Sequence, residues 1–303
     1  MAEIVEYFFF SLINRIARRL SFGSAEKAGA WLGNAAYSLT NLRKGVTLDN
    51  LRKSFPEKSE LEIHAIARGA YKNYGIALVE SLWASGQSAK TLQGAIRVVN
   101  PEVMRQARLR QKGVLLLSAH FGSWELLVSS VRLNIGAPLV CIVQRQRNKR
   151  IDAVFETNRS RFGNVTIPMG SSLRKVLQAL ADNRVILLLG DQSGPKEAVF
   201  VDFFGRPAAT HRGVAAFSLK TGAPIVMCFL VRQMDGTYAL TFEEVDRSGL
   251  ESSSEENIIE LTRRHVAILE RWIRKHPDHW LWMHKRWKHT QFYEEHYSVE
   301  QEA

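Results

Sequence analysis

Cysteine is scarce in this chain of 303 residues, with only Cys141 and Cys228 present. Each lies in an apolar run, so both are predicted to be buried thiols of a protein from a reducing compartment and not parts of a disulfide framework. Nucleotide-binding motifs are also lacking, because there is no Gly-x4-Gly-Lys-Ser/Thr loop and no Gly-x-Gly-x2-Gly turn. A serine hydrolase is disfavoured too: no Gly-x-Ser-x-Gly elbow occurs, and GDQSG at residues 190–194 has the wrong spacing.

Acidic residues are in the minority, with 30 Asp and Glu against 41 Lys and Arg and a formal net charge of +11. This balance predicts an anionic partner, which could be nucleic acid, an acidic membrane leaflet or a phosphorylated substrate. Charge alone does not choose among the three. A hydrophobic content of 46% over this length allows one large domain, or one domain with a smaller helical region.

The N-terminal apolar run, residues 4–13, is too short to span a bilayer, which takes roughly 20 residues. It is followed by Arg15, Arg18 and Arg19 and has no small-residue cleavage site, so it is not an export signal. The pattern indicates an amphipathic helix. Two interpretations stay open: an interfacial membrane anchor, or a core helix packed on the rest of the chain.

Residues 25–88 read as helices, and Ser59 with Glu62 forms a capping box for the last of them. From about residue 92 short apolar runs alternate with helical stretches. Buried strands are predicted at 113–120, 138–145, 184–192 and 223–231, and a more exposed strand at 238–245. The predicted fold is α/β, a mixed, partly parallel sheet flanked by helices with an N-terminal helical region. We divide the chain into a helical region (1–92), an α/β domain (93–293) and a polar tail (294–303).

The segment HFGSWE, residues 120–125, joins a predicted strand to a predicted helix. In one continuous helix His120 and Glu125 would lie about 140° apart, whereas a turn through Gly122 and Ser123 lets the carboxylate come back toward the imidazole. A carboxylate beside one imidazole nitrogen fixes the tautomer, and the other nitrogen can deprotonate an alcohol. The alternative is structural: His120 caps a strand end, and Glu125 favours a helix N-terminus.

Tryptophan and basic residues are interleaved in residues 271–289. This composition suits a membrane interface, with rings in the headgroup zone and cations on phosphates. A nucleic-acid patch and a histidine metal site are competing interpretations. No metal is expected, because no cysteine lies nearby and no recognised histidine pair shares a helix face. The residues concerned are Trp272, Trp280, Trp282, Trp287, His276, His279, His284 and His289.

Five segments follow one another along the chain: AHFGSWE, NRSRFGNVTIP, VILLLGDQSGP, VFVDFFGRPAATHRGVAAFSLKTGAPIV and HPDHWLWMHKRWK. Taken in this order, they resemble the bacterial late acyltransferases of lipid A synthesis, the lauroyl and myristoyl transferases. NLRKSFPEKSELEIHAIARGAYKNYG is similar to the family's N-terminal helical segment, so the resemblance covers nearly the whole chain. It implies a glycerolipid acyltransferase-like fold. Each segment is a weak signal alone, but their joint order is specific.

The resemblance also implies roles for particular residues. His120 would be the general base that acts on the acceptor hydroxyl, with Glu125 as its orienting partner. Either Arg159 or Arg161 would meet acceptor phosphate or developing oxyanion charge by forked hydrogen bonds, and the sequence does not say which. Substrate-binding residues would be Asp191 and Gln192, at the carboxyl end of a strand, and Phe204 and Arg206, whose block in related enzymes helps to bind the acceptor.

The implied reaction transfers a fatty acyl group from an acyl carrier protein or coenzyme A thioester to a hydroxyl of a phosphorylated lipid A precursor. Because the thioester is already activated, no cofactor is expected. The acidic donor, the phosphorylated glycolipid and an anionic membrane surface would all suit the charge of the chain, and no nucleic-acid partner is expected. The implied location is the cytoplasmic face of the inner membrane, peripheral or shallowly anchored through the N-terminal helix.

Two alternatives stay open. One is another acyltransferase of the same superfamily, acting on a different glycolipid, such as a phosphoinositol mannoside, or on a lysophospholipid. The other is a non-enzymatic module that binds a membrane or nucleic acid.

Overall fold

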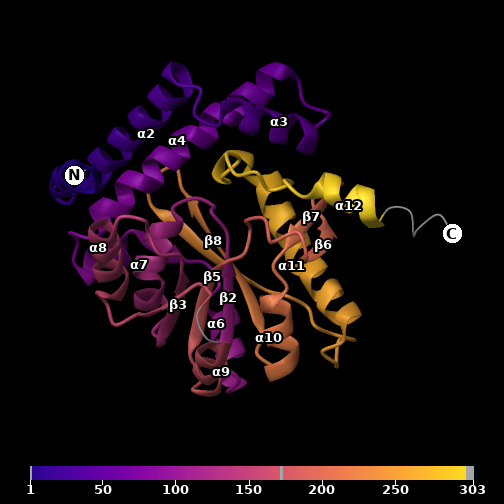
Figure 1. Ribbon diagram of the computed structural model, residues 1–303. Helices are drawn as coiled ribbons and strands as arrows, with labels where there is room; N and C mark the ends of the chain where they lie inside the picture. Colours follow the sequence, from indigo (N-terminus) through magenta and orange to yellow (C-terminus); the bar gives the residue numbers. More distant parts are fainter. Residues whose placement is uncertain (1, 171–172, 298–303) are drawn as a thin grey trace.

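The computed structural model describes residues 2–170 and 173–297. Its centre is a seven-stranded sheet in the order β1-β9-β8-β2-β5-β3-β4 (Figure 1). Neighbouring strands are parallel except β8 and β9, which are antiparallel. A separate antiparallel hairpin pairs β6 with β7. The predicted α/β fold with a mixed, partly parallel sheet is confirmed.

Helices and strands alternate along much of the chain after the N-terminal helices. The strands are β1 (Ile96–Val98), β2 (Val114–Ser118), β3 (Leu139–Val143), β4 (Val165–Pro168), β5 (Val185–Leu189), β6 (Val199–Asp202), β7 (Pro207–Thr210), β8 (Ile225–Arg232) and β9 (Tyr238–Glu244). The helices are α1 (Ala2–Ala17), α2 (Phe22–Leu39), α3 (Lys44–Ser54), α4 (Glu60–Ala84), α5 (Ala89–Gly94), α6 (Pro101–Leu109), α7 (Trp124–Ile135), α8 (Lys149–Ser160), α9 (Leu173–Ala181), α10 (Gly213–Thr221), α11 (Glu255–Lys275) and α12 (Thr290–Tyr297).

Helices α1 to α5 precede the first strand, which confirms the predicted N-terminal helical region. Its boundary at residue 92 stays a prediction, as do the other domain limits. The predicted polar tail, residues 294–303, begins inside α12, and residues 298–303 lie outside the described residues.

Hydrophobic layers cover both faces of the sheet. In β2, Leu115 and Leu117 pack on the side of α9, α10 and α11, whereas Val114 and Leu116 pack on the side of α6 and α7. All four side chains are buried. This double burial explains why the strand reads as a continuous apolar run and not as an alternating pattern.

The five predicted strands correspond to β2, β3, β5, β8 and β9. The last of them, β9, is less fully buried than β2 and β8, because Thr241, Glu243 and Glu244 are partly exposed, although its other residues are buried. Strand β1 pairs along the outer edge of β9; α5 lies against β1, and α6 packs against β9. With only three residues, β1 was too short to be recognised in the sequence.

Trp280 and Trp282, expected in a membrane interface layer, are buried instead. Their rings pack edge-to-face with centroids 4.7 Å apart, and Phe203 and Phe204 pack against them. The chain therefore turns back into the core after α11. The interface prediction was wrong for these two residues, because aromatic packing decides their position.

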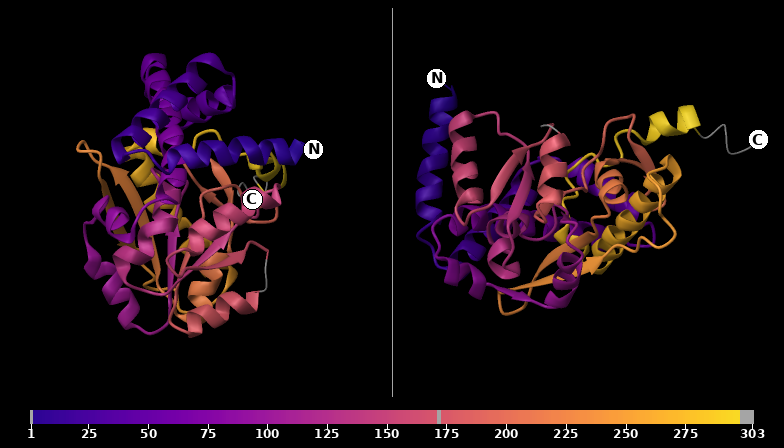
Figure 2. Two further views of the ribbon diagram at one scale, coloured as in Figure 1. Left: turned by 90° about the vertical axis from the view of Figure 1, so that its left-hand side faces the viewer. Right: turned by 90° about the horizontal axis from the view of Figure 1, so that it is seen from below.

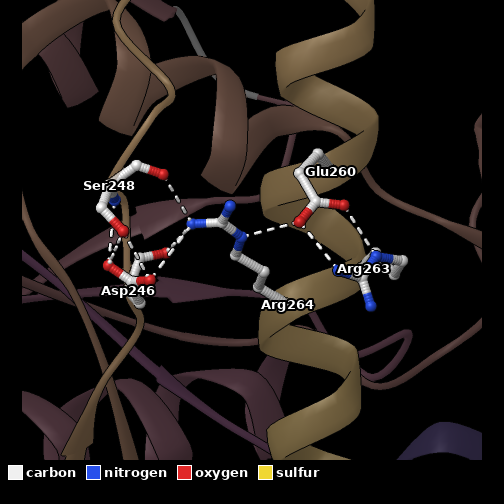
Figure 3. Close-up of polar contacts among 5 residues, drawn as sticks. All are labelled: Asp246, Ser248, Glu260, Arg263 and Arg264. Atoms are coloured by element: carbon white, nitrogen blue, oxygen red, sulfur yellow. Dashed lines mark hydrogen bonds and ion pairs between the residues drawn. The ribbon is translucent and has the colours of Figure 1, made fainter.

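Charged side chains fasten α11 to the loop after β9 (Figure 3). Arg264 donates hydrogen bonds to Glu260 at 2.7 Å and to the carbonyl oxygens of Asp246 and Ser248, each at 3.0 Å. Hydrogen bonds from Arg263 and Arg264 lower the pKa of Glu260 to about 2. These hydrogen bonds position α11, which leads into residues 276–281, and those residues contact the site described below.

Helices α2 and α4 cross at glycines. An ideal Cβ atom on Gly33 would lie 2.2 Å from the carbonyl oxygen of Tyr71, and one on Gly75 would lie 2.3 Å from that of Gly29. Only a hydrogen atom at these positions lets the two backbones approach so closely. The crossing matters for the site because α4 carries Glu80, which holds a turn of the site.

We expect Gly33→Ala to destabilise the fold by about 1–3 kcal/mol, the usual cost of overpacking a core. Gly23→Ala is the matched control in the same helix, because no atom lies within 4 Å of its ideal Cβ. Alanine has the better helix propensity, so the control should be neutral or slightly stabilising. Urea titration measures the free energy of unfolding. Equal stability of the two variants would contradict the close crossing.

Candidate active site

His120 and Asp191 come together because β2 and β5 are parallel neighbours. Ser118 of β2 pairs with Leu189 of β5. His120 follows Ser118 by two residues, and Asp191 follows Leu189 by two residues. The register therefore brings His120 opposite Asp191 at the carboxyl edge of the sheet. Ligands of α/β proteins bind at such edges.

The carboxylate of Asp191 is buried and accepts three hydrogen bonds. Its Oδ1 lies 2.9 Å from Nδ1 of His120, and its Oδ2 accepts from the His120 backbone N–H at 3.0 Å and from Nε1 of Trp280 at 2.9 Å. An ionised carboxylate only accepts, so Nδ1 carries a proton, and in the neutral ring Nε2 keeps its lone pair. Asp191 thus has the place on the ring that the sequence interpretation assigned to Glu125.

The pair shifts both pKa values in the direction that favours an ion pair. Burial lowers the pKa of His120, but the charge of Asp191, its hydrogen bond and the charge of Glu125 together raise the pKa above its usual value. Burial would raise the pKa of Asp191, but His120 and the hydrogen bonds from Trp280 and the backbone keep it below its usual range. The result is a more basic imidazole in a protein cavity.

The turn after β2 is held by the segment that follows α11. Phe121 forms an isolated antiparallel bridge with Trp280. The backbone N–H of Leu281 donates to the carbonyl oxygen of His120 at 3.1 Å. These contacts fix the backbone on which the imidazole is mounted.

Gly122 is required at the centre of this turn. Its backbone N–H donates to the carbonyl oxygen of His279 at 2.8 Å. Its φ is +57°, and an ideal Cβ would lie 2.0 Å from the carbonyl oxygen of Leu230. A side chain here would both strain the backbone and collide with β8.

A buried carboxylate from α4 holds the other part of the turn. Glu80 accepts hydrogen bonds from Ser123 Oγ at 2.8 Å, from the Tyr238 hydroxyl at 2.6 Å and from the Arg232 guanidinium. Burial raises the pKa of Glu80, although Arg232 and the hydrogen bonds oppose that rise. Because Ser123 precedes α7, the network fixes where that helix begins.

Glu125 and Arg159 form an ion pair at 2.7 Å, with both side chains mostly buried. Burial lowers the pKa of Arg159, but the charge and hydrogen bond of Glu125 outweigh it and raise the pKa above its usual value. Arg161 instead donates to the carbonyl oxygen of Ser85 at 2.9 Å and so ties α8 to the end of α4. Of the two candidate arginines, the structure brings only Arg159 to Glu125 and the cavity around His120.

The cavity has a volume of about 510 Å³, within the usual range for small-molecule sites. His120, Glu125, Arg159 and Gln192 form polar parts of its lining. Apolar side chains from α7, the sheet and α10 complete the wall, among them Val128, Cys141, Ile142, Leu187, Leu188 and Val214. The cavity thus combines a basic imidazole, a cation and an extended apolar surface.

Gln192 lies beside the second ring nitrogen of His120, with 3.4 Å between its Nε2 and Nε2 of His120. His284 reaches the same loop, since its Nε2 accepts from the Ser193 N–H at 3.1 Å. Burial lowers the pKa of His284 to about 4, so its ring is neutral near pH 7. The sequence interpretation missed the positions of His284 and Trp280, because no local pattern links them to a loop about ninety residues earlier.

Phe204 and Arg206 do not line the cavity. Phe204 is buried in the core and packs on Trp282. The Arg206 guanidinium lies 3.6 Å from the centroid of the Trp287 ring and donates to Ser54, and burial lowers its pKa to about 10. Their predicted contacts with substrate stay predictions.

We expect Asp191→Asn to lower the pKa of His120. With the charge of Asp191 removed, burial becomes the dominant influence, so the pKa should move from above its ordinary value of 6.5 to below it. NMR titration of the ring C–H signals measures the shift, with His120 assigned from the spectrum of His120→Gln. The titration curve of the remote His289 should be the same in Asp191→Asn as in the unaltered chain. An unchanged His120 pKa would contradict the pairing with Asp191.

The sequence was compared with protein families and with known proteins. The family model described as bacterial lipid A biosynthesis acyltransferase matches residues 2–289. The lipid A biosynthesis palmitoleoyltransferase of Escherichia coli is 24% identical over 262 residues, which cover 86% of this chain and 83% of the relative. The lauroyltransferase of the same organism is 25% identical over 265 residues, 86% and 84% of the two chains. Its myristoyltransferase is 24% identical over 259 residues, 84% and 78%. Because the family model covers nearly all of the chain, the protein belongs to the bacterial lipid A biosynthesis acyltransferase family.

Proposed function

We propose that this chain transfers a fatty acyl group from the thioester of an acyl carrier protein, or of coenzyme A, to a hydroxyl of a phosphorylated lipid A precursor. The observation that carries the proposal is the imidazole of His120 in the cavity, with Nδ1 on Asp191 and the lone pair on Nε2. The names of the matched relatives, which are lipid A palmitoleoyl-, lauroyl- and myristoyltransferases, support the acyl group and the acceptor.

In the proposed reaction, Nε2 of His120 takes the proton of the acceptor hydroxyl while the oxygen attacks the thioester carbonyl carbon. The C–O bond forms first. The C–S bond breaks when the tetrahedral intermediate collapses, and the leaving thiolate takes the proton from the imidazolium. Asp191 stabilises the imidazolium between these steps. The substrate oxygen is the nucleophile, so no covalent enzyme intermediate is needed.

Arg159 supplies positive charge inside the cavity, where it would stabilise the tetrahedral oxyanion or an acceptor phosphate. Glu125 holds the guanidinium at 2.7 Å, and its negative charge also raises the pKa of His120. Glu125 therefore has two proposed effects that need no hydrogen bond to the ring: it positions Arg159, and it favours the imidazolium.

The apolar wall of the cavity would hold the acyl chain of the donor. Leu187 and Leu188 of β5, Ile142 of β3 and Val128 of α7 belong to this wall. Each buried methylene contributes about 0.8 kcal/mol of binding free energy, so the wall favours a long hydrocarbon chain over a short one. The acyl group thereby provides the energy that aligns the thioester with His120.

Membrane contact is proposed for α1. Seven large apolar side chains along one side of this helix are about half exposed or more, namely Ile4, Val5, Phe8, Phe9, Leu12, Ile13 and Ile16. The opposite side packs on the protein, where Phe10 meets Phe155 and Ala17 is buried. The interpretation as an ordinary core helix therefore does not account for the exposed side. Among the described residues, no helix is both long and apolar enough to cross a bilayer.

We expect His120→Ala and Glu125→Ala to lower acyl transfer from acyl carrier protein to a tetra-acylated precursor by about 10²-fold or more, the usual contribution of a general base and its charge partners. Mass spectrometry of the lipid product measures transfer, and a parallel assay with acyl coenzyme A compares the donors. His64→Ala and Glu57→Ala are remote controls. Full turnover in both active-site variants would contradict the proposed chemistry.

For membrane contact, the expected result is that Phe8→Ser combined with Phe9→Ser weakens vesicle binding about tenfold, because two rings no longer enter the interface. Leu109→Ser combined with Val99→Ser is the matched control, since both side chains are exposed on other parts of the protein. Co-flotation with vesicles measures binding. Equal losses in both double variants would show that α1 has no special part.

A further inference from the structure

A hollow of about 890 Å³ lies between α1 and α8, and it shares no lining residue with the cavity of His120. The two helices lie side by side (Figure 2). Near their starts, Asn148 Nδ2 donates to the carbonyl oxygen of Glu3 at 2.9 Å. Near their ends, both approach Ser85, whose hydroxyl donates to Asn14 and whose carbonyl oxygen accepts from Arg161. The helices therefore run in the same direction along the hollow.

Four arginines line this hollow, and no acidic residue does; we call it the arginine hollow. They are Arg15, Arg18, Arg19 and Arg150, all exposed. Within residues 2–170 and 173–297, none of the four forms an ion pair with a carboxylate. By contrast, Arg159 of the same helix α8 pairs with Glu125. Like charges gathered without counter-charges create a positive potential that favours an anion.

The arginines stand at both ends of the hollow. Arg150 lies in the first turn of α8, whereas Arg15 and Arg18 lie at the end of α1 beside Gly86. Because Asn148 lies beside Glu3, Arg150 lies level with about residue 5 of α1. Arg15 follows ten residues later, so the two ends are about 15 Å apart along the helices. Ser11 and Thr157 line the hollow between the two ends. The site thus offers cations for phosphate oxygens and hydroxyl groups for a polar headgroup.

The exposed apolar side of α1 leads directly to the arginines. Phe8 is 65% exposed, and Arg15 follows it by seven residues, which places the two side chains only about 20° apart around the helix axis. An anion that occupies the hollow therefore lies beside a helix surface suited to hydrocarbon. This combination fits a lipid better than a soluble anion.

We propose that the arginine hollow binds the phosphate headgroup of an anionic phospholipid while α1 lies in the membrane interface. Guanidinium groups match phosphate oxygens by forked hydrogen bonds, and Ser11 and Thr157 match the hydroxyls of a headgroup such as glycerol. The proposal rests on the membrane contact proposed for α1. It does not rest on acyl transfer, because the hollow and the cavity are lined by different residues.

The test compares two triple variants of the full chain that lose the same charge. The hollow variant combines Arg15→Gln, Arg18→Gln and Arg150→Gln and so removes three cations from the hollow. The control variant combines Arg97→Gln, Arg105→Gln and Arg174→Gln and so removes three exposed arginines elsewhere. Co-flotation measures binding to vesicles of phosphatidylcholine alone and of phosphatidylcholine mixed with phosphatidylglycerol. Circular dichroism checks that both variants are folded.

The expected result is that the hollow variant loses about tenfold or more of its binding to the anionic vesicles, since each arginine near such a surface contributes about fivefold. Binding to phosphatidylcholine should not change, the control variant should change less than about twofold, and salt should weaken the wild-type preference. Equal losses in both variants would overturn the proposal, because they would show attraction by net charge only.

Two further outcomes would also overturn it. If vesicle binding were unchanged but the KM for the phosphorylated acceptor in detergent rose, the hollow would serve the acceptor and not a phospholipid. If glycerol phosphate alone displaced the protein from anionic vesicles at low concentration, the ligand would be a soluble phosphate. The vesicle assay contains neither donor nor acceptor, so failure of the acyl-transfer proposal would leave its result unaffected.

Discussion

The pairing register of β2 and β5 is the constraint on which the candidate active site depends. Ser118 opposite Leu189 sets His120 opposite Asp191, and a slip of one residue would turn one of these side chains to the other face of the sheet. Asp191 would then be a buried carboxylate without its partners, which costs several kcal/mol. The sheet therefore sets the hydrogen bonds of the site, and those hydrogen bonds in turn favour one register.

The turn that carries the imidazole is held by segments far away in the chain. Glu80 on α4 holds Ser123, residues 279–281 pair with the turn backbone, and Gly122 fits closely against β8. The position of α4 depends in its turn on the glycine crossing with α2. The geometry around His120 is thus a property of the whole fold, so distant substitutions in the N-terminal helices should alter the active site.

Much of the sheet could be predicted because buried parallel strands are continuous apolar runs, and His120 stood out at the end of one of them. The partner of its ring could not be predicted, since local sequence does not show that β2 and β5 are neighbours. Composition also does not distinguish core residues from membrane-interface residues, because tryptophan is common in both. The buried Trp280 and Trp282 illustrate this. For α1, the core-helix interpretation describes the side that packs on the protein, and the membrane-anchor interpretation describes the exposed apolar side.

The wall of the cavity has a second role in the protein. Cys141 and Leu187 line the cavity and are also almost wholly buried members of the sheet core. Their size sets both the room inside the cavity and the packing of β3 and β5. A substitution that lengthens or shortens the space for a hydrocarbon chain therefore also changes folding stability. In this architecture, new substrate preferences must evolve together with compensating changes in the core.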